Sequence, residues 1–256
     1  MAETQARGGA SASRRRVRRF FIALGALCLL ATLFAALVLR GVIRLNTPSR
    51  ADFPVWGVDV SHYQGDIDWE TLAAQGVRFA YIKATEGSSF ADPCFVQNRQ
   101  RAAETPLRTG AYHFFSFESS GDTQADNFIA QVPKWEGMLP PAVDVEFYGA
   151  FRQAPLPAGQ VQGQLDIMLA RLEQHYGVRP ILYATQSAYA RYLADYDGYD
   201  IWIRNVFTRP QLGARRWAFW QYTDRARLQG YDGEERFIDM NVFNGSRAEF
   251  EVYGLK

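Results

Sequence analysis

Two acidic side chains, Asp144 and Glu146, stand two positions apart at the end of an apolar run, PPAVDVEFYG (residues 140–149). Alternation along a β-strand would send both to one face, with their Cβ atoms about 7 Å apart. Such a pair can cleave a glycosidic bond: one acid protonates the leaving oxygen while the other, ionised, stabilises positive charge on the sugar carbon. Mutual repulsion and partial burial would keep their pKa values apart.

The same pair has two other interpretations. It could be the exposed end of a strand, or part of a cation site to which Asp59 and Asp239 add the oxygen ligands that Mg²⁺ or Ca²⁺ requires. A metal-dependent hydrolase therefore stays open on the residues alone. Aromatic residues near the expected strand ends favour a sugar, because the apolar faces of pyranose rings pack on aromatic rings. They are Tyr63, Tyr112, Phe114, Tyr148, Tyr183, Trp202, Trp220 and Tyr222.

The elements that would position these residues alternate along the chain from residue 55. Short apolar runs predict strands at 55–61, 78–85, 109–116, 141–147, 179–185, 201–206, 216–223 and 238–244. Amphipathic stretches predict helices at 68–76, 93–105, 121–132 and 159–176. The alternation predicts an α/β fold with a parallel sheet closed as a β/α barrel, irregular because the later crossovers are short.

Each apolar run ends in side chains that can do chemistry. In a parallel β/α barrel the C-terminal strand ends meet on one face, where active sites are built. The sequence therefore predicts an active site on that face, formed by Asp59, Lys83 with Glu86, His113, Asp144 with Glu146, Tyr183, Asn205, Gln221 and Asp239.

Charge is unevenly distributed along the chain. Residues 1–50 hold nine Arg and one acid; subtracting these from 28 basic and 27 acidic residues leaves 19 and 26, a formal charge of −7 for residues 51–256. Nucleic-acid phosphates bind to basic surfaces, and this domain is acidic. We therefore expect no nucleic-acid partner. Cys28 lies in an apolar run and Cys94 stands alone, expected to be buried, so the sequence predicts neither a disulfide nor a zinc site.

The N-terminal segment predicts a membrane anchor. The basic stretch RRRVRR (14–19) precedes twenty residues without formal charge (20–39), about 30 Å long as a helix, which matches the hydrocarbon core of a bilayer. We expect a basic cytoplasmic tail (1–19), a transmembrane signal anchor (20–40), a linker (41–54) and a catalytic domain (55–256) on the periplasmic or extracellular side of the inner or plasma membrane. A cleaved signal peptide and a twin-arginine signal are the alternatives.

Seven segments, in this order, resemble glycoside hydrolase family 25, the muramidases that include phage and bacterial lysozymes. They are GVDVSHYQGDIDW (57–69), FAYIKATEGSSFADPCF (79–95), GAYHFF (110–115), PAVDVE (141–146), PILYAT (180–185), WQYT (220–223) and DMNVFNG (239–245). The resemblance implies an irregular TIM-like (β/α) barrel with a long acidic groove. It also implies hydrolysis of the β-1,4 bond between N-acetylmuramic acid and N-acetylglucosamine in peptidoglycan strands, without cofactor or metal. We expect a monomer, and a catalytically silent peptidoglycan-binding module is the second alternative.

The resemblance also assigns roles. By position, Glu146 resembles the general acid, and Asp144 the residue that assists the anomeric centre with retention of configuration. Asp144 either attacks directly or orients the 2-acetamido group of the substrate; we favour the acetamido route. Asp59 and Asp239 match two further groove acids. The expected substrate-binding residues are Tyr63, Tyr112, Tyr183, Trp202 and Gln221.

Four further residues have expected roles outside the catalytic pair. We expect His62 to line the groove or be structural rather than to form a base with Asp59, and Lys83 to form a structural ion pair with Glu86. His113 is expected to be a hydrogen-bonded strand histidine. Arg204 departs from the family pattern and could pair with an acid or with a peptidoglycan carboxylate.

Overall fold

The structure is a computed structural model that describes residues 3–40, 42–43 and 46–255, with side chains from residue 14 onward. The chain divides into two compact units, Met1–Leu45 and Asn46–Lys256. Residues 41, 44 and 45 of the expected linker lie outside the described residues. The later part of that linker belongs to the second unit, because Phe53 is buried and stacks on Trp217 at 5.8 Å between ring centroids.

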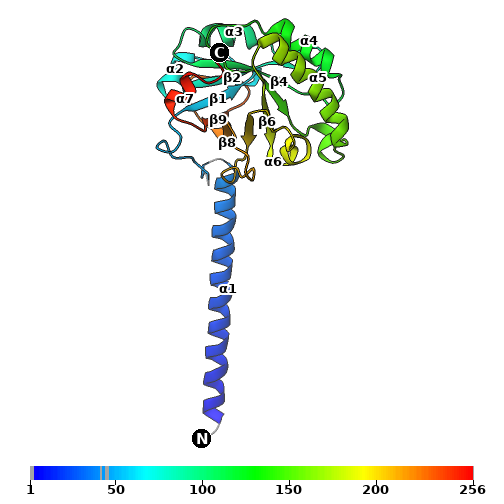
Figure 1. Ribbon diagram of the computed structural model, residues 1–256. Helices are drawn as coiled ribbons and strands as arrows, with labels where there is room; N and C mark the ends of the chain where they lie inside the picture. Colours follow the sequence, from blue (N-terminus) through cyan, green and yellow to red (C-terminus); the bar gives the residue numbers. More distant parts are fainter. Residues whose placement is uncertain (1–2, 41, 44–45, 256) are drawn as a thin grey trace. The chain divides into compact units, whose positions relative to one another are not determined.

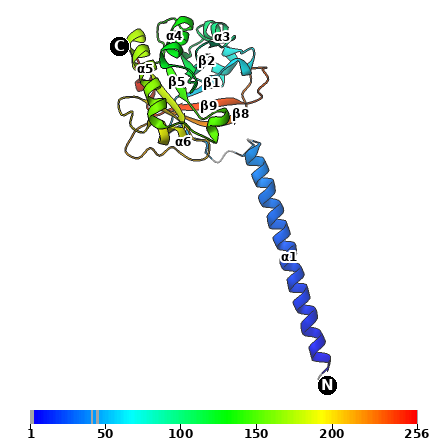
Figure 2. The ribbon, with the colours of Figure 1, turned by 90° about the vertical axis from the view of Figure 1, so that its right-hand side faces the viewer.

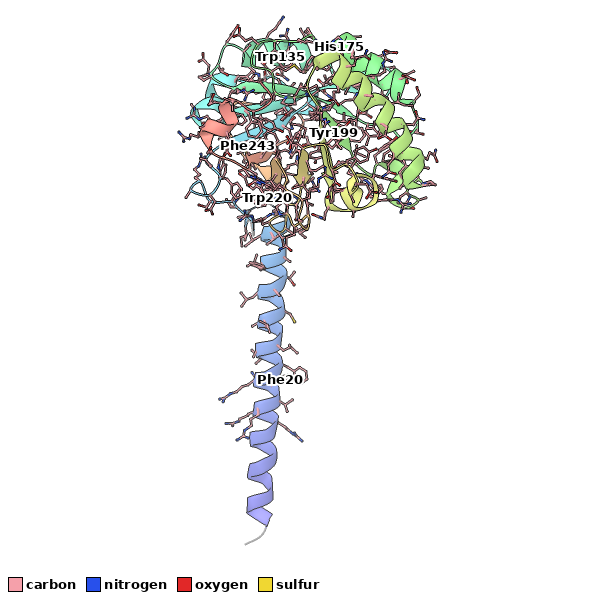
Figure 3. All side chains as sticks on the ribbon, in the orientation of Figure 1. Phe20, Trp135, His175, Tyr199, Trp220 and Phe243 are labelled. Atoms are coloured by element: carbon pink, nitrogen blue, oxygen red, sulfur yellow. The ribbon has the colours of Figure 1, made fainter. Side chains whose placement is uncertain are left out.

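The first unit is the helix α1 (Glu3–Leu39). Its segment Arg14–Leu39 is long and apolar enough to cross a membrane by length and composition, a test that a signal sequence also passes. Its large apolar side chains are exposed; Phe20, for example, stands clear of the helix (Figure 3). An exposed apolar helix of this length needs an apolar environment, which either a membrane anchor or a signal sequence would find.

The second unit is built around a barrel of eight strands (Figure 1). The sheet order is β1-β9-β8-β7-β6-β5-β4-β2, and the pairing of β1 with β2 closes it; the two-residue strand β3 is added to β2. All eight expected strands are confirmed. They are β1 (Trp56–Val60), β2 (Phe79–Glu86), β4 (Arg108–Phe114), β5 (Ala142–Val145), β6 (Ile181–Thr185), β7 (Ile201–Arg204), β8 (Phe219–Ala226) and β9 (Ile238–Phe243), with β3 at Phe90–Ala91.

The expectation of an all-parallel sheet is wrong for one strand. β9 pairs antiparallel with both of its neighbours, β1 and β8. The reason is the length of the connection: residues 227–237 contain no helix, and a parallel crossover needs about a dozen or more residues. The chain therefore turns back as a hairpin, and the beginning of β9, not its end, reaches the face where the other strands end.

Helices cover the barrel unevenly. The four expected helices are confirmed as α2 (Trp69–Ala74), α3 (Phe95–Ala102), α4 (Gly121–Gln131) and α5 (Ala158–Tyr176), and α4 and α5 lie side by side on the outside of the barrel (Figure 2). Later connections hold only short turns, α6 (Gln186–Ala188) and a π-turn (Tyr189–Leu193), before the terminal helix α7 (Arg247–Glu251). This confirms the irregular barrel that the short crossovers predicted.

Aromatic side chains fill the lower interior of the barrel. Phe79, Tyr81, Trp202, Phe219 and Phe243 belong to one buried cluster inside the strands. Two glycines make room for it: a Cβ at residue 57 would lie 2.4 Å from the Phe79 ring, and one at residue 110 would lie 2.4 Å from the Tyr81 ring. This layer closes the barrel from below and forms the base on which polar residues at the strand ends are arranged.

Candidate active site

The catalytic carboxylates that the sequence predicts stand above the aromatic layer because strand side chains alternate with a period of two. Asp144 lies two residues after the interior Ala142 on β5, and Gln221 two residues after the interior Phe219 on β8. Asp59 of β1 and Asp239 of β9 are directly paired in the antiparallel register. Strand geometry alone therefore brings acids from three strands to one opening.

All nine residues predicted to be catalytic or to bind substrate line a single cavity of about 230 Å³. Of the other strand-end residues predicted for this face, Lys83 also lines the cavity, whereas Glu86, His113 and Asn205 are not part of its lining. Trp202 and Gln221 are almost fully buried in it, whereas Tyr63 is about half exposed at its edge. The nine are Asp59, Tyr63, Tyr112, Asp144, Glu146, Tyr183, Trp202, Gln221 and Asp239. A larger cavity of about 850 Å³ shares Glu146, Tyr183, Asp239 and Glu235 with it, so that the two form one continuous cleft.

A hydrogen-bond network fixes the floor of the cleft. The Tyr183 hydroxyl donates to Gln221 Oε1 at 2.9 Å and lies 3.3 Å from Glu146 Oε1. With its oxygen occupied, Gln221 turns its amide nitrogen toward the acids and donates to Asp59 Oδ2 at 2.9 Å and Asp239 Oδ2 at 3.1 Å. Gln221 thus links the side of the cleft that carries Glu146 to the side that carries the two other acids.

A second amide, Asn241, orients Asp59. Its side-chain nitrogen donates to Asp59 Oδ2 at 2.7 Å, and its oxygen accepts from Trp202 Nε1, also at 2.7 Å. Asn241 was not among the residues predicted for the site, although it stands two positions after Asp239 on the same strand, where the alternation of strand side chains could have revealed it.

Asp144 and Glu146 have different electrostatic surroundings. Burial, and then the neighbouring Glu146, raise the pKa of Asp144 well above its usual range, against the opposing effect of Lys83. Within the described part of the chain, Asp144 Oδ1 is buried and has no hydrogen-bond partner. Burial also raises the pKa of Glu146, but the Arg204 charge and the Tyr183 hydroxyl oppose the increase. Of the two acids, Asp144 therefore has the more strongly raised pKa.

Asp59 and Asp239 form a second coupled pair. Burial, and then the Asp59 charge, raise the pKa of Asp239 well above its usual range. Burial also raises the pKa of Asp59, while hydrogen bonds from Asn241 and Gln221 favour its ionised form. The stronger increase at Asp239 makes it the member of the pair that favours its protonated form, and Asp59 the member that favours its ionised form. The cleft thus favours the protonated form of its carboxyl groups, as a general acid requires.

The other sequence expectations have mixed outcomes. The ion pair of Lys83 with Glu86 is confirmed at 2.6 Å, although Lys83 also lines the cleft. His113 is confirmed as a buried, hydrogen-bonded histidine. His62 Nδ1 lies 2.7 Å from Asp92 Oδ2, so the aspartate it pairs with is not Asp59. The expected burial of Cys94 is wrong, because it is only half-buried.

Glu235 lines both parts of the cleft but was missed by the sequence analysis. It lies on the irregular connection between β8 and β9, so no strand end marks it in the sequence. Metal ligation, the rival interpretation of the acids, finds no arranged site among the described residues: none of their His, Cys, Asp and Glu side chains form a group of three or more that could hold an ion.

Comparison with known proteins gives consistent matches. The family model described as Glycosyl hydrolases family 25 matches residues 58–231. Lysozyme M1 of Streptomyces globisporus is 34% identical over 207 residues, covering 76% of this chain and 69% of its own length. The uncharacterized protein YegX of Escherichia coli K12 is 36% identical over 215 residues, covering 80% of this chain and 76% of its own. A family 25 glycosyl hydrolase structure from Bacillus anthracis superposes with a TM-score of 0.78 and 51% identity, covering 83% of this chain and 98% of its own.

Proposed function

The chain belongs to glycosyl hydrolase family 25, and on that basis we propose that it is a lysozyme acting on bacterial peptidoglycan. The bond cleaved is the β-1,4 link from N-acetylmuramic acid to N-acetylglucosamine. One observation supports the proposal most: Asp144 Oδ1, a buried carboxylate oxygen with no hydrogen-bond partner among the residues that the structure describes, stands beside a second acid in an aromatic-lined cleft. Such an acceptor suits a substrate that brings its own N–H donor, as a 2-acetamido sugar does.

Glu146 is the general acid in this mechanism. It gives its proton to the glycosidic oxygen while the acetamido carbonyl oxygen of the muramic acid attacks C1 and the bond to the leaving sugar breaks. Asp144 accepts the acetamido N–H and stabilises the positive charge that develops on that group. Water then attacks C1 as the bond between C1 and the acetamido oxygen breaks and the acetamido group is restored. Glu146 takes a proton from the water, and the product retains its configuration.

Substrate binding itself sets the protonation states that this mechanism needs. An N–H donated to Asp144 Oδ1 favours the ionised form of that carboxyl group and lowers its pKa. The negative charge of Asp144 then raises the pKa of the neighbouring Glu146, which favours the protonated form of the general acid. An acetamido sugar bound at Asp144 thus helps Glu146 to keep the proton that it donates.

Asp59 and Asp239 bind the sugar and adjust the pKa values of Asp144 and Glu146. Both are linked through Gln221 to the Tyr183 hydroxyl, which lies beside Glu146. Tyr63 and Tyr112 line the cavity and offer ring faces to the glycan.

Clearing of purified cell walls tests the activity. Wild-type protein should lower turbidity and release reducing sugar, and Glu146→Gln should lose about 10²–10⁴-fold in rate. Equal release by both proteins would contradict the assignment and leave a silent peptidoglycan-binding module as the better explanation. A chelator should leave the rate unchanged, whereas a metal-dependent hydrolase would lose its activity.

The N-terminal helix leads us to a proposal on location. Residues 1–19 form a cytoplasmic tail, residues 20–40 an uncleaved signal anchor, and the domain acts on the periplasmic or extracellular side. The apolar helix Arg14–Leu39 supports this, together with the basic residues before its apolar part. N-terminal sequencing of the protein from membranes should find the original N-terminus; a mature protein that begins after residue 40 would indicate a cleaved signal instead.

A further inference from the structure

The two parts of the cleft differ sharply in their positive charges. The smaller cavity around the acids contains a single cation, Lys83, which is already paired with Glu86. The larger cavity contains four arginines. Each cavity is lined by five acids, three of which are shared. The two cavities therefore differ in their number of cations and not in their number of acids. The four arginines are Arg152, Arg204, Arg225 and Arg236, and we call them the arginine cluster.

The cluster is assembled from separate parts of the fold. Arg152 ends the short 3₁₀ turn after β5 (Gly149–Arg152), Arg204 ends β7, and Arg225 lies near the end of β8. Arg236 comes from the connection between β8 and β9. Four guanidinium groups thus converge on one cavity from four chain segments, next to the edge formed by Glu146.

Among the residues that the structure describes, most N–H donors of the cluster have no acceptor. Arg204 Nη2 donates to Asp224 at 2.6 Å, and Arg225 Nε lies 3.8 Å from the same carboxylate, so one acid serves two cations. Arg152 donates through Nε to the Phe147 carbonyl. Within the described part of the chain, neither Arg152 nor Arg236 has a carboxylate within 4 Å.

Three other exposed arginines of the domain have carboxylate partners of their own. Arg101 pairs with Asp66, Arg171 with two aspartates, and Arg179 with Glu173. A guanidinium group carries five N–H donors in a planar fork that fits a carboxylate bidentately. The cluster therefore presents spare, correctly shaped donors for carboxylates that are not part of this protein.

We propose that the arginine cluster binds the carboxylates of the peptide attached to the lactyl group of muramic acid, and that the enzyme therefore prefers peptide-bearing glycan strands. The inference rests on the proposed function, because the muramic acid that carries the peptide would bind beside Glu146, which lines both the smaller and the larger cavity. A peptide of four residues extends up to roughly 14 Å and can span that cavity. A strand without peptides keeps only the lactyl carboxylate and engages the cluster less.

Two substrates and two variants test the preference. The full-length chain in detergent is assayed on soluble uncrosslinked strands with their peptides, and on the same strands after an amidase has removed the peptides. Wild type should show a kcat/KM at least about fivefold higher on peptide-bearing strands. The double variant Arg225→Gln with Arg236→Gln should lose about fivefold on these strands and clearly less on the others. Arg216→Gln, an exposed arginine outside the cleft lining, is the matched control and should behave as wild type.

A binding measurement separates this inference from the proposed function. Calorimetry compares an N-acetylmuramoyl peptide with free carboxylates against the same compound with its carboxylates amidated. Wild type should bind the free form more tightly, and the double variant should not distinguish them. Equal binding of both compounds by wild type, or an equal loss of kcat/KM on both strands in the double variant, overturns the inference. If wild type cleaves neither strand, the proposed function fails, and the calorimetry alone decides on the peptide site.

Discussion

Asparagine in place of Asp144 keeps the shape of the side chain and removes its charge, and we predict a protein that is more stable at pH 7 but almost inactive. The wild-type carboxylate is buried, is repelled by Glu146, and has one oxygen without a partner among the described residues. Asparagine also leaves this position without a partner, so the gain comes from removing the buried charge: each unit by which folding raises the pKa costs the folded state about 1.4 kcal/mol at pH values above it. Removing the charge should therefore raise the free energy of unfolding by about 1–2 kcal/mol, or the Tm by about 2–8 °C for a domain of this size.

The increase in the free energy of unfolding that Asp144→Asn produces should become smaller as the pH falls. Because burial raises the pKa of Asp144, the folded state keeps a proton that the unfolded chain loses as the pH rises above 3.8. Asp144 therefore lowers the free energy of unfolding of wild type as the pH rises from 3.8 toward the raised pKa of the folded state. Below pH 3.8 it has no effect on stability, because the carboxyl group is protonated in both states. The advantage of Asp144→Asn should be largest at pH 7 and shrink toward pH 4, while activity falls about 10²–10³-fold at both.

Thermal unfolding of the full-length chain in one detergent, at both pH values, measures this difference. Asp197→Asn, a change at an exposed aspartate, is the control and should leave the Tm unaltered. A lower Tm for Asp144→Asn at pH 7, or the same gain at both pH values, would refute the claim that the charge of Asp144 is destabilising. Activity within about tenfold of wild type would refute its role in transition-state stabilisation.

Two further changes probe the surroundings of the pair. Tyr183→Phe removes a hydrogen bond that lowers the pKa of Glu146. The alkaline limb of the pH–rate profile should therefore move to higher pH, and kcat should fall about tenfold. An alkaline limb at the wild-type pH would contradict this role of Tyr183. Burial lowers the pKa of His113 to about 4, so this histidine binds a proton more readily in the unfolded chain than in the folded one. Wild type should therefore lose stability as the pH falls from 6.5 to 4. His113→Asn should remove about 3 kcal/mol of that loss in chemical denaturation series, and an unchanged slope would contradict the assignment.

Much of the fold could be predicted from the sequence because its signals are local. Strand positions follow from short apolar runs, and the grouping of Asp144 with Glu146 follows from the period of two along a strand. The direction of β9 could not be predicted this way, because direction depends on how the chain returns after β8. Asp239 reached the predicted face for a reason other than the expected one: it stands at the beginning of a reversed strand.

The electrostatic differences within the site could not be predicted from spacing. Strand alternation makes Asp144 and Glu146 equivalent, whereas their pKa values depend on Arg204 and Tyr183 beside Glu146 and on the lack of a donor at Asp144 Oδ1. These contacts join residues far apart in the chain. The same holds for the arginine cluster, whose members come from four segments and share no sequence motif.

The most direct test of the central claim is the identity of the new reducing ends made from peptidoglycan. Digested strands are reduced with borohydride and their fragments are analysed by mass spectrometry, with Glu146→Gln digested in parallel. A cleft in which Glu146 protonates the oxygen of the N-acetylglucosamine leaving group must produce fragments that end in reduced muramic acid, absent from the variant digest. Fragments ending in reduced glucosamine, or free peptides with intact glycan, would contradict the account.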